Sequence, residues 1–210
     1  MRKCHAVTIL ILLLIIITCV FREDILSMLG CSYREIYNKK LSENEIEELR
    51  EEINIQNIQY KWKEELENNN EPIILIYHHT AIKNISPLEI DELHKNKGWN
   101  GIGYHYYIRK DGSIYTGRDE ESVGSHTKGY NKVSIGVCLE GNFEEEYLTE
   151  SQMKSLEQLS VYLCLKYDIK DILPHRELGK TLCPGKNFPM EEIKTAVIEE
   201  IKSIKVNKSK

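Results

Sequence analysis

The chain has 210 residues, of which 41% are hydrophobic and 29% are charged, so it can bury one sizeable core. Its formal net charge of -5 argues against a protein that holds nucleic acid by neutralising phosphates. The charge is uneven along the chain: residues 1–40 carry a net +3, residues 41–71 a net -7 and residues 72–210 a net -1. These differences predict regions with different roles.

The N-terminus carries an uncharged, almost wholly apolar run over residues 6–21, preceded by Arg2 and Lys3. As a helix it would extend about 24 Å, somewhat less than the ~30 Å core of a bilayer. No small-x-small cleavage site follows it, so we expect residues 1–21 to be an uncleaved signal anchor, with a cleaved signal peptide as the alternative. The basic residues before the run place the rest of the chain outside the membrane.

Residues 22–55 are expected to form an acidic helical linker. Ser42 and Glu45 have the spacing of a capping box and predict the start of a short helix. The apolar period then changes to two at Ile58, Tyr60 and Trp62, the pattern of a strand. We therefore place a catalytic-sized domain at residues 56–205 and a tail at residues 206–210.

The elements expected within this domain alternate between strands and helices. They are a strand at 73–77, a helix beginning at Ser86-Pro87, strands at 104–109 and 113–116 around the turn Asp111-Gly112, a strand at 134–139, a helix capped by Thr149 and Gln152, a strand at 171–173, and a final helix after Pro189. This order predicts an α/β fold with one central mixed β-sheet flanked by helices.

Histidine and cysteine, the ligands that zinc prefers, concentrate at three places. These are His78-His79 after a buried strand, His105 on the next strand, and His175 with Cys183 in a late loop. Consecutive strand residues point to opposite faces, so His79 is left out of the metal set and His105 is expected to be a buried hydrogen-bonding residue. A histidine taken by itself is more often a surface or hydrogen-bonded core residue than a metal ligand. The spacing of these residues alone therefore does not decide whether they form a metal site.

Longer motifs carry a resemblance to a known family. They are Ile76-Tyr77-His78-His79-Thr80-Ala81, Gly98-Trp99-Asn100-Gly101-Ile102-Gly103-Tyr104-His105-Tyr106, Val123-Gly124-Ser125-His126-Thr127-Lys128-Gly129-Tyr130-Asn131, and Pro174-His175-Arg176-Glu177 followed by Cys183-Pro184. In this order they resemble the zinc N-acetylmuramoyl-L-alanine amidases of the phage-lysozyme and peptidoglycan recognition protein family. The resemblance covers residues 56–200 and implies that family's fold.

The resemblance also implies the roles of six residues. The zinc ligands would be His78, His175 and Cys183. Tyr104 would be the catalytic tyrosine, Thr181 would stand where phage members have a catalytic lysine, and His126 would contact substrate. Lys180 adjoins Thr181 but is out of register with that position.

We therefore expect a membrane-anchored, extracytoplasmic and monomeric enzyme that uses Zn²⁺ to hydrolyse the amide between N-acetylmuramic acid and L-alanine in peptidoglycan. The alternative is a receptor on the same fold that binds peptidoglycan without cleaving it. The combination of all three ligands with Tyr104 favours the enzyme.

Overall fold

The computed structural model describes residues 40–207, and residues 41–201 form one compact unit. No helix among the described residues is long and apolar enough to cross a membrane. The signal anchor expected at residues 1–21 lies outside the described residues, as does most of the expected linker.

A six-stranded mixed sheet forms the centre of the described part of the chain. Its strands, in the order in which they pair, are β1 (Ile55–Gln56), β4 (Ile114–Thr116), β3 (Tyr106–Ile108), β5 (Ser134–Leu139), β2 (Ile74–His79) and β6 (Asp171–Pro174). Only the β3–β4 pair is antiparallel, as the hairpin turn at Asp111-Gly112 predicted. The expected mixed sheet is thus confirmed.

Five helices lie before, between and after these strands in the described part of the chain: α2 (Glu43–Glu51), α3 (Pro87–Asn96), α4 (Glu150–Tyr167), α5 (His175–Leu178) and α6 (Met190–Asn207). The three helix starts predicted from capping boxes are confirmed. In each, the side chain of the cap residue accepts the N–H three residues on, and that residue's side chain accepts the N–H of the cap residue. The cap residues are Ser42, Ser86 and Thr149.

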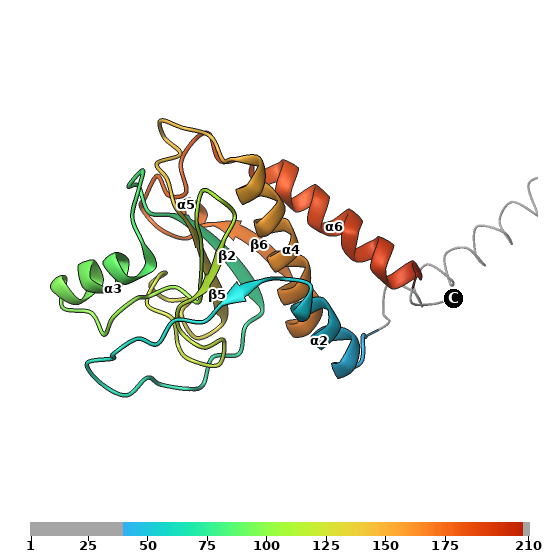
Figure 1. The fold of residues 1–210 in the computed structure, drawn as a ribbon, viewed down its shortest axis with the longest axis horizontal. Helices are drawn as coiled ribbons and strands as arrows, with labels where there is room; N and C mark the ends of the chain where they lie inside the picture. Colours follow the sequence, from blue (N-terminus) through green and yellow to red (C-terminus); the bar gives the residue numbers. More distant parts are fainter. Residues whose placement is uncertain (1–39, 208–210) are drawn as a thin grey trace, which may run out of the picture. The chain divides into compact units, whose positions relative to one another are not determined.

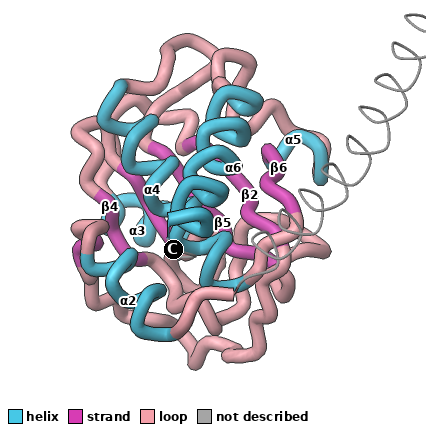
Figure 2. The backbone as a smooth tube through the Cα atoms, turned by 90° about the vertical axis from the view of Figure 1, so that its right-hand side faces the viewer, coloured by secondary structure: helices cyan, strands magenta, loops and turns pink. Residues whose placement is uncertain are grey.

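The sheet has a helix layer on each face (Figures 1 and 2). Helices α4 and α6 lie together on one face, and α3 lies on the other. The Tyr77 hydroxyl lies 2.6 Å from the Ser160 hydroxyl of α4, so Tyr77 faces the α4 side of the sheet. Because neighbouring strand residues alternate, His78 faces the opposite side. There a buried cluster containing Ile90 of α3 and Cys138 of β5 forms the core.

Two expectations near the start of the domain differ from the structure. No strand forms over residues 58–62. Instead, the Tyr60 hydroxyl donates to the Thr116 carbonyl, and the rings of Tyr60 and Trp62 pack against the buried cluster. The edge of β4 is already paired with β1, so this segment forms no ladder; its rings hold it, together with the Ile58 N–H, which donates to the Thr116 hydroxyl at 3.1 Å.

Helix α2 belongs to the compact unit, although the sequence suggested a linker up to residue 55. It packs against α4, and Ile53, just after it, is only 7% exposed. An amphipathic helix is stabilised chiefly by burying its apolar face, and α4 offers a surface on which to do so.

Candidate metal centre and active site

Three side chains that are far apart in sequence converge at one end of the sheet. One ligand atom from each of His78, His175 and Cys183 lies within 4.8 Å of the others. His78 is near the end of β2, and His175 follows β6 directly as the first residue of α5. Strands β2 and β6 are parallel neighbours, so their carboxyl ends meet and the two imidazole rings lie 4.6 Å apart.

Backbone contacts bring Cys183 to this pair. The Arg176 N–H donates to the Cys183 carbonyl at 2.7 Å, and the Arg176 guanidinium donates to the Gly185 carbonyl at 2.7 Å. The N–H of His79 points at the Cys183 sulfur, 3.4 Å away. The cysteine is therefore held from both α5 and the end of β2.

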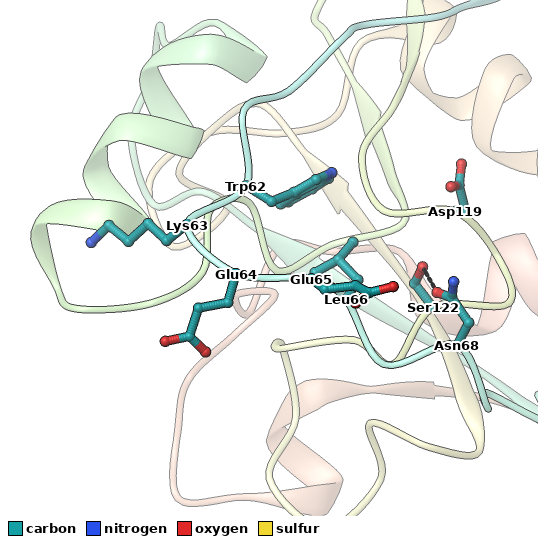
Figure 3. A pocket seen from close by; sticks show the side chains of 8 residues that line it. All are labelled: Trp62, Lys63, Glu64, Glu65, Leu66, Asn68, Asp119 and Ser122. Carbon is teal, nitrogen blue, oxygen red and sulfur yellow. Dashed lines mark hydrogen bonds between the residues drawn. The ribbon is translucent and has the colours of Figure 1, made fainter.

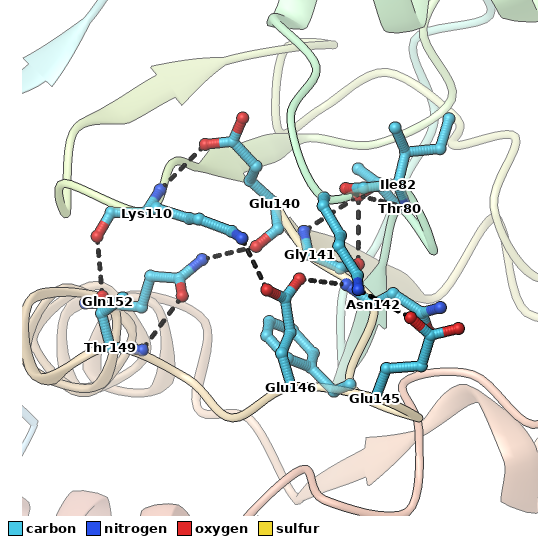
Figure 4. A network of polar contacts seen from close by, with 12 residues as sticks. Thr80, Ile82, Lys110, Glu140, Gly141, Asn142, Glu145, Glu146, Thr149 and Gln152 are labelled. Carbon is cyan, nitrogen blue, oxygen red and sulfur yellow. Dashed lines mark hydrogen bonds and ion pairs between the residues drawn. The ribbon is translucent and has the colours of Figure 1, made fainter.

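The loop that follows β5 supports the cysteine loop from a third side. The Phe143 carbonyl accepts the Asn187 N–H at 2.9 Å, and the Glu144 carboxylate accepts the Lys186 N–H at 2.8 Å. A polar network ties this loop to α4 and to the segment after β2 (Figure 4). Within it the Lys110 ammonium pairs with Glu146 at 2.6 Å.

Burial sets the protonation of the three candidate ligands. It lowers the pKa of His78 well below the ordinary value, and the nearby His175 adds to this effect. Burial also lowers the pKa of His175 and raises that of Cys183 to about 12, against the opposing effects of the His79 N–H and Arg176. Both imidazoles are thus neutral at pH 7, as metal ligation requires, while the thiol must release its proton when a metal binds.

The donor set fits zinc. The His78 Nδ1 atom lies 3.7 Å from the Cys183 sulfur. Two ligands on one tetrahedral zinc, with bonds of about 2.0 to 2.3 Å, are separated by about 3.5 Å. Two imidazoles and one thiolate from the protein leave a fourth position open, the arrangement of a catalytic rather than a structural site.

Tyr104 lies beside His78, and Thr181 lies beside Cys183. The ring of Tyr104 is centred 5.1 Å from that of His78. Burial, with Cys138 and Cys183 nearby, raises the pKa of Tyr104 well above 10, so its hydroxyl is protonated at neutral pH. The Thr181 hydroxyl accepts the Cys183 N–H at 3.1 Å, and its own hydrogen is left available to donate.

His126, for which the sequence predicts a substrate contact, is nearly buried behind His78. It is only 9% exposed, and its Nδ1 atom lies 3.0 Å from Nε2 of His78. Asn131, in the same loop, accepts the N–H groups of His126 and Thr127 through its side-chain oxygen. The motif around His126 thus forms a buried support behind a ligand, a role that sequence spacing gave no signal for.

His79 and His105 take the positions expected of them. His79 points away from the candidate ligands and accepts the Phe143 N–H at its Nδ1 atom. His105 is fully buried, with Nε2 at 2.9 Å from the Ser122 carbonyl and Nδ1 accepting the Gly136 N–H. The described residues that group as a possible metal site include neither of them.

A separate cavity of about 480 Å³ lies away from these ligands (Figure 3). It is lined by residues of the segment after β1 and of the loop after β4: Trp62, Lys63, Glu64, Glu65, Leu66, Asn68, Asp119 and Ser122. None of the three candidate ligands borders it.

Comparison with known proteins agrees with this geometry. Residues 68–186, more than half of the chain, match the family model Amidase_2, described as N-acetylmuramoyl-L-alanine amidase. The chain belongs to this family. The match contains all three candidate ligands together with Tyr104, His126 and Thr181.

The amidase domain has relatives among both phage enzymes and animal recognition proteins. The endolysin of Escherichia phage T7 is 43% identical over 108 residues, 49% of this chain and 72% of the phage protein. The solved endolysin N-acetylmuramoyl-L-alanine amidase LysCS from Clostridium intestinale is 52% identical, with a TM-score of 0.66 over 67% of this chain and 93% of its own. Peptidoglycan recognition protein LE, solved with tracheal cytotoxin, is 27% identical, with a TM-score of 0.58 over 65% of this chain and 87% of its own. The family resemblance seen in the sequence is confirmed.

Proposed function

We propose that the chain is a zinc-dependent enzyme that hydrolyses the amide between N-acetylmuramic acid and L-alanine in peptidoglycan. The convergence of His78, His175 and Cys183 carries this proposal, because it brings three side chains that could hold a metal ion together inside a domain of the amidase family. When bound, zinc supplies Lewis acidity, which acidifies water and polarises a carbonyl.

The chain's own residues supply the proton and the charge stabilisation. Hydrolysis breaks the carbon–nitrogen bond of the amide, adds a hydroxyl to the acyl carbon and adds a proton to the departing amine. The ring of Tyr104 lies beside His78, and its protonated hydroxyl, which has Cys138 and Cys183 nearby, would orient water or transfer that proton. Thr181 has a free hydroxyl hydrogen next to Cys183 and would donate to the carbonyl oxygen as negative charge grows on it.

Digestion of purified peptidoglycan by the full-length protein, followed by mass spectrometry, tests this proposal. We expect stem peptides with a free L-alanine amine and glycan strands without peptide, and we expect both to disappear when a chelator is added. A protein that carries one zinc ion and binds peptidoglycan but releases no peptide would instead be a receptor, the alternative that the recognition-protein relatives represent.

We further propose that residues 1–21 anchor the protein to the cell membrane, with the amidase domain outside the cytoplasm and active as a monomer. The apolar run and the basic residues before it support the orientation, and the location of peptidoglycan outside the membrane agrees with it. Fusions of a periplasm-dependent and a cytoplasm-dependent reporter to the C-terminus test the topology. Activity of the cytoplasmic reporter alone would contradict it.

A further inference from the structure

A buried row of hydrogen bonds lies behind His78, on the side of the ring away from Cys183. The Nε2 atom of His78 is 3.0 Å from Nδ1 of His126, and Nε2 of His126 is 3.3 Å from the Ser134 hydroxyl. The Ser134 hydroxyl is in turn 2.7 Å from the Tyr130 carbonyl. All three side chains are at least nine-tenths buried, so each polar atom must find its partner within the protein.

The carbonyl at the end of this row determines where each proton lies. A carbonyl oxygen only accepts, so the Ser134 hydroxyl donates its one hydrogen to Tyr130. The Ser134 oxygen must then accept from Nε2 of His126. A neutral imidazole with a proton on Nε2 has none on Nδ1, so His126 accepts at Nδ1 and His78 donates from Nε2.

Thr127 joins the row without changing this result. Its hydroxyl lies 3.1 Å from Nδ1 of His126 and 3.4 Å from Nε2 of His78. If Thr127 donates to His126, its oxygen accepts from His78. If Thr127 donated to His78 instead, two unprotonated nitrogens, Nδ1 of His126 and Nε2 of His78, would face each other 3.0 Å apart with no hydrogen between them. The proton of His78 is therefore on Nε2, and the lone pair on Nδ1 faces the Cys183 sulfur.

The position of the His126 ring is closely constrained. A Cβ atom at Gly136 would lie 2.6 Å from the ring, and one at Gly124 would lie 2.5 Å from it. The side-chain oxygen of Asn131 accepts the N–H groups of both His126 and Thr127, and so it holds the backbone that carries the ring. The ring therefore rests between two glycines with little room to turn.

We propose that His126 and Ser134 are positioning residues that hold His78 in the tautomer protonated at Nε2 and fix its ring orientation, which leaves Nδ1 free to bind the metal. Partners of this kind raise the affinity of a metal site by selecting one tautomer and one orientation of a ligand. The inference rests on the proposed zinc-dependent function for its metal readout, but the tautomer itself can be observed without metal or substrate.

The direct test is nitrogen-15 NMR of the metal-free, full-length protein labelled at histidine. Chemical shifts of ring nitrogens distinguish protonated from unprotonated atoms. We expect His78 and His126 to be protonated at Nε2 and unprotonated at Nδ1. His105 is an internal reference, because a carbonyl at its Nε2 and an N–H at its Nδ1 impose that same tautomer. A His78 protonated at Nδ1, or averaging between tautomers, would overturn the proposal.

Zinc affinity of variants, measured by competition with a chelator, gives the second test. His126→Leu removes the acceptor 3.0 Å from the His78 Nε2 atom, leaves only the Thr127 oxygen at 3.4 Å, and should weaken zinc binding by about 10- to 100-fold. His126→Asn places a carbonyl oxygen near the former Nδ1 position and should recover part of that loss. Equal losses in both variants, or no loss in either, would contradict the positioning role.

A matched pair of serine variants separates positioning from general destabilisation. Ser134→Ala should weaken zinc binding by about three- to tenfold and broaden the His126 signals, because the ring loses the acceptor for its proton. Ser160 is equally buried and bonds to Tyr77 on the opposite face of the sheet. Ser160→Ala should leave zinc affinity unchanged, and a loss equal to that of Ser134→Ala would overturn the proposal. An inactive protein with the expected tautomer and affinities would count against the proposed amidase activity alone.

Discussion

The Nδ1 atom of His78 lies 3.7 Å from the sulfur of Cys183, although 105 positions separate the two residues in the sequence. Parallel pairing of β2 with β6 brings His175 to the same place, so the three candidate ligands meet where two strands end. Open α/β sheets commonly bind ligands at the carboxyl ends of their strands. Because the three residues lie on separate segments of the chain, each can be replaced by itself to test whether it binds the metal.

Replacing Cys183 with alanine should abolish both zinc binding and peptidoglycan hydrolysis. Thiolate ligation contributes much of the affinity of such a site, and the remaining two imidazoles cannot hold the ion tightly. Zinc content by mass spectrometry and peptide release measure the two effects. Cys164→Ala is the control, because this free cysteine lies on α4, and it should retain metal and activity. Normal zinc content in Cys183→Ala would remove this residue from the ligand set.

Replacing Tyr104 with phenylalanine should retain zinc while reducing kcat by about 10²- to 10⁴-fold, the usual contribution of a proton-transferring side chain. The ring beside His78 is kept and only the hydroxyl is lost. The control is Tyr107→Phe, which removes a buried hydrogen bond to the Ile85 carbonyl and should cost about 1 kcal/mol of stability without lowering kcat. An unchanged kcat in Tyr104→Phe would exclude this hydroxyl from the chemistry.

Gly136→Ala should displace the His126 ring, which lies behind His78. The new Cβ would lie 2.6 Å from the His126 ring, so the ring or the β5 backbone must move, at a cost of about 1 to 3 kcal/mol in unfolding free energy. Gly179→Ala is a suitable comparison, since its Cβ would lie 3.5 Å from His175, an ordinary contact. Urea unfolding and zinc titration of both variants check this. Equal stability of the two would show that the site adapts to the added methyl.

The half-buried Glu120 should contribute to stability in a pH-dependent way. Burial raises its pKa, but hydrogen bonds from Lys166, Tyr106 and Tyr167 together outweigh that effect and lower the pKa below its ordinary value of 4.5. A carboxylate with a lowered pKa stabilises the fold fully above its unfolded value and loses this contribution as the pH falls through the folded value.

Glu120→Gln should therefore lower the unfolding free energy at pH 7 by about 1 to 3 kcal/mol. The difference from the unmodified protein should shrink as the pH falls below 4.5. Thermal unfolding across this range measures both effects. The exposed neighbour Glu121 provides the control, and Glu121→Gln should change little at any pH. A difference that grows toward acid pH would contradict the assigned direction.

Local sequence patterns determined much of the secondary structure. The cap residues Ser42, Ser86 and Thr149 begin helices where predicted, because a capping box needs only residues three positions apart. The apolar run at 134–139 forms β5, a fully buried strand. The family motifs likewise indicated His78, His175, Cys183 and Tyr104, since each motif is a short contiguous string.

Only the tertiary structure decided which groups surround those side chains. The sequence suggested a strand at residues 58–62, but pairing of β1 with β4 leaves that segment to pack through its rings. It also suggested His126 as a substrate contact, but only the structure shows that the loop before β5 places the His126 ring behind His78 and against Gly136. Local patterns depend on neighbours a few residues apart, but strand register decides which distant side chains share a face, and no local pattern encodes that register.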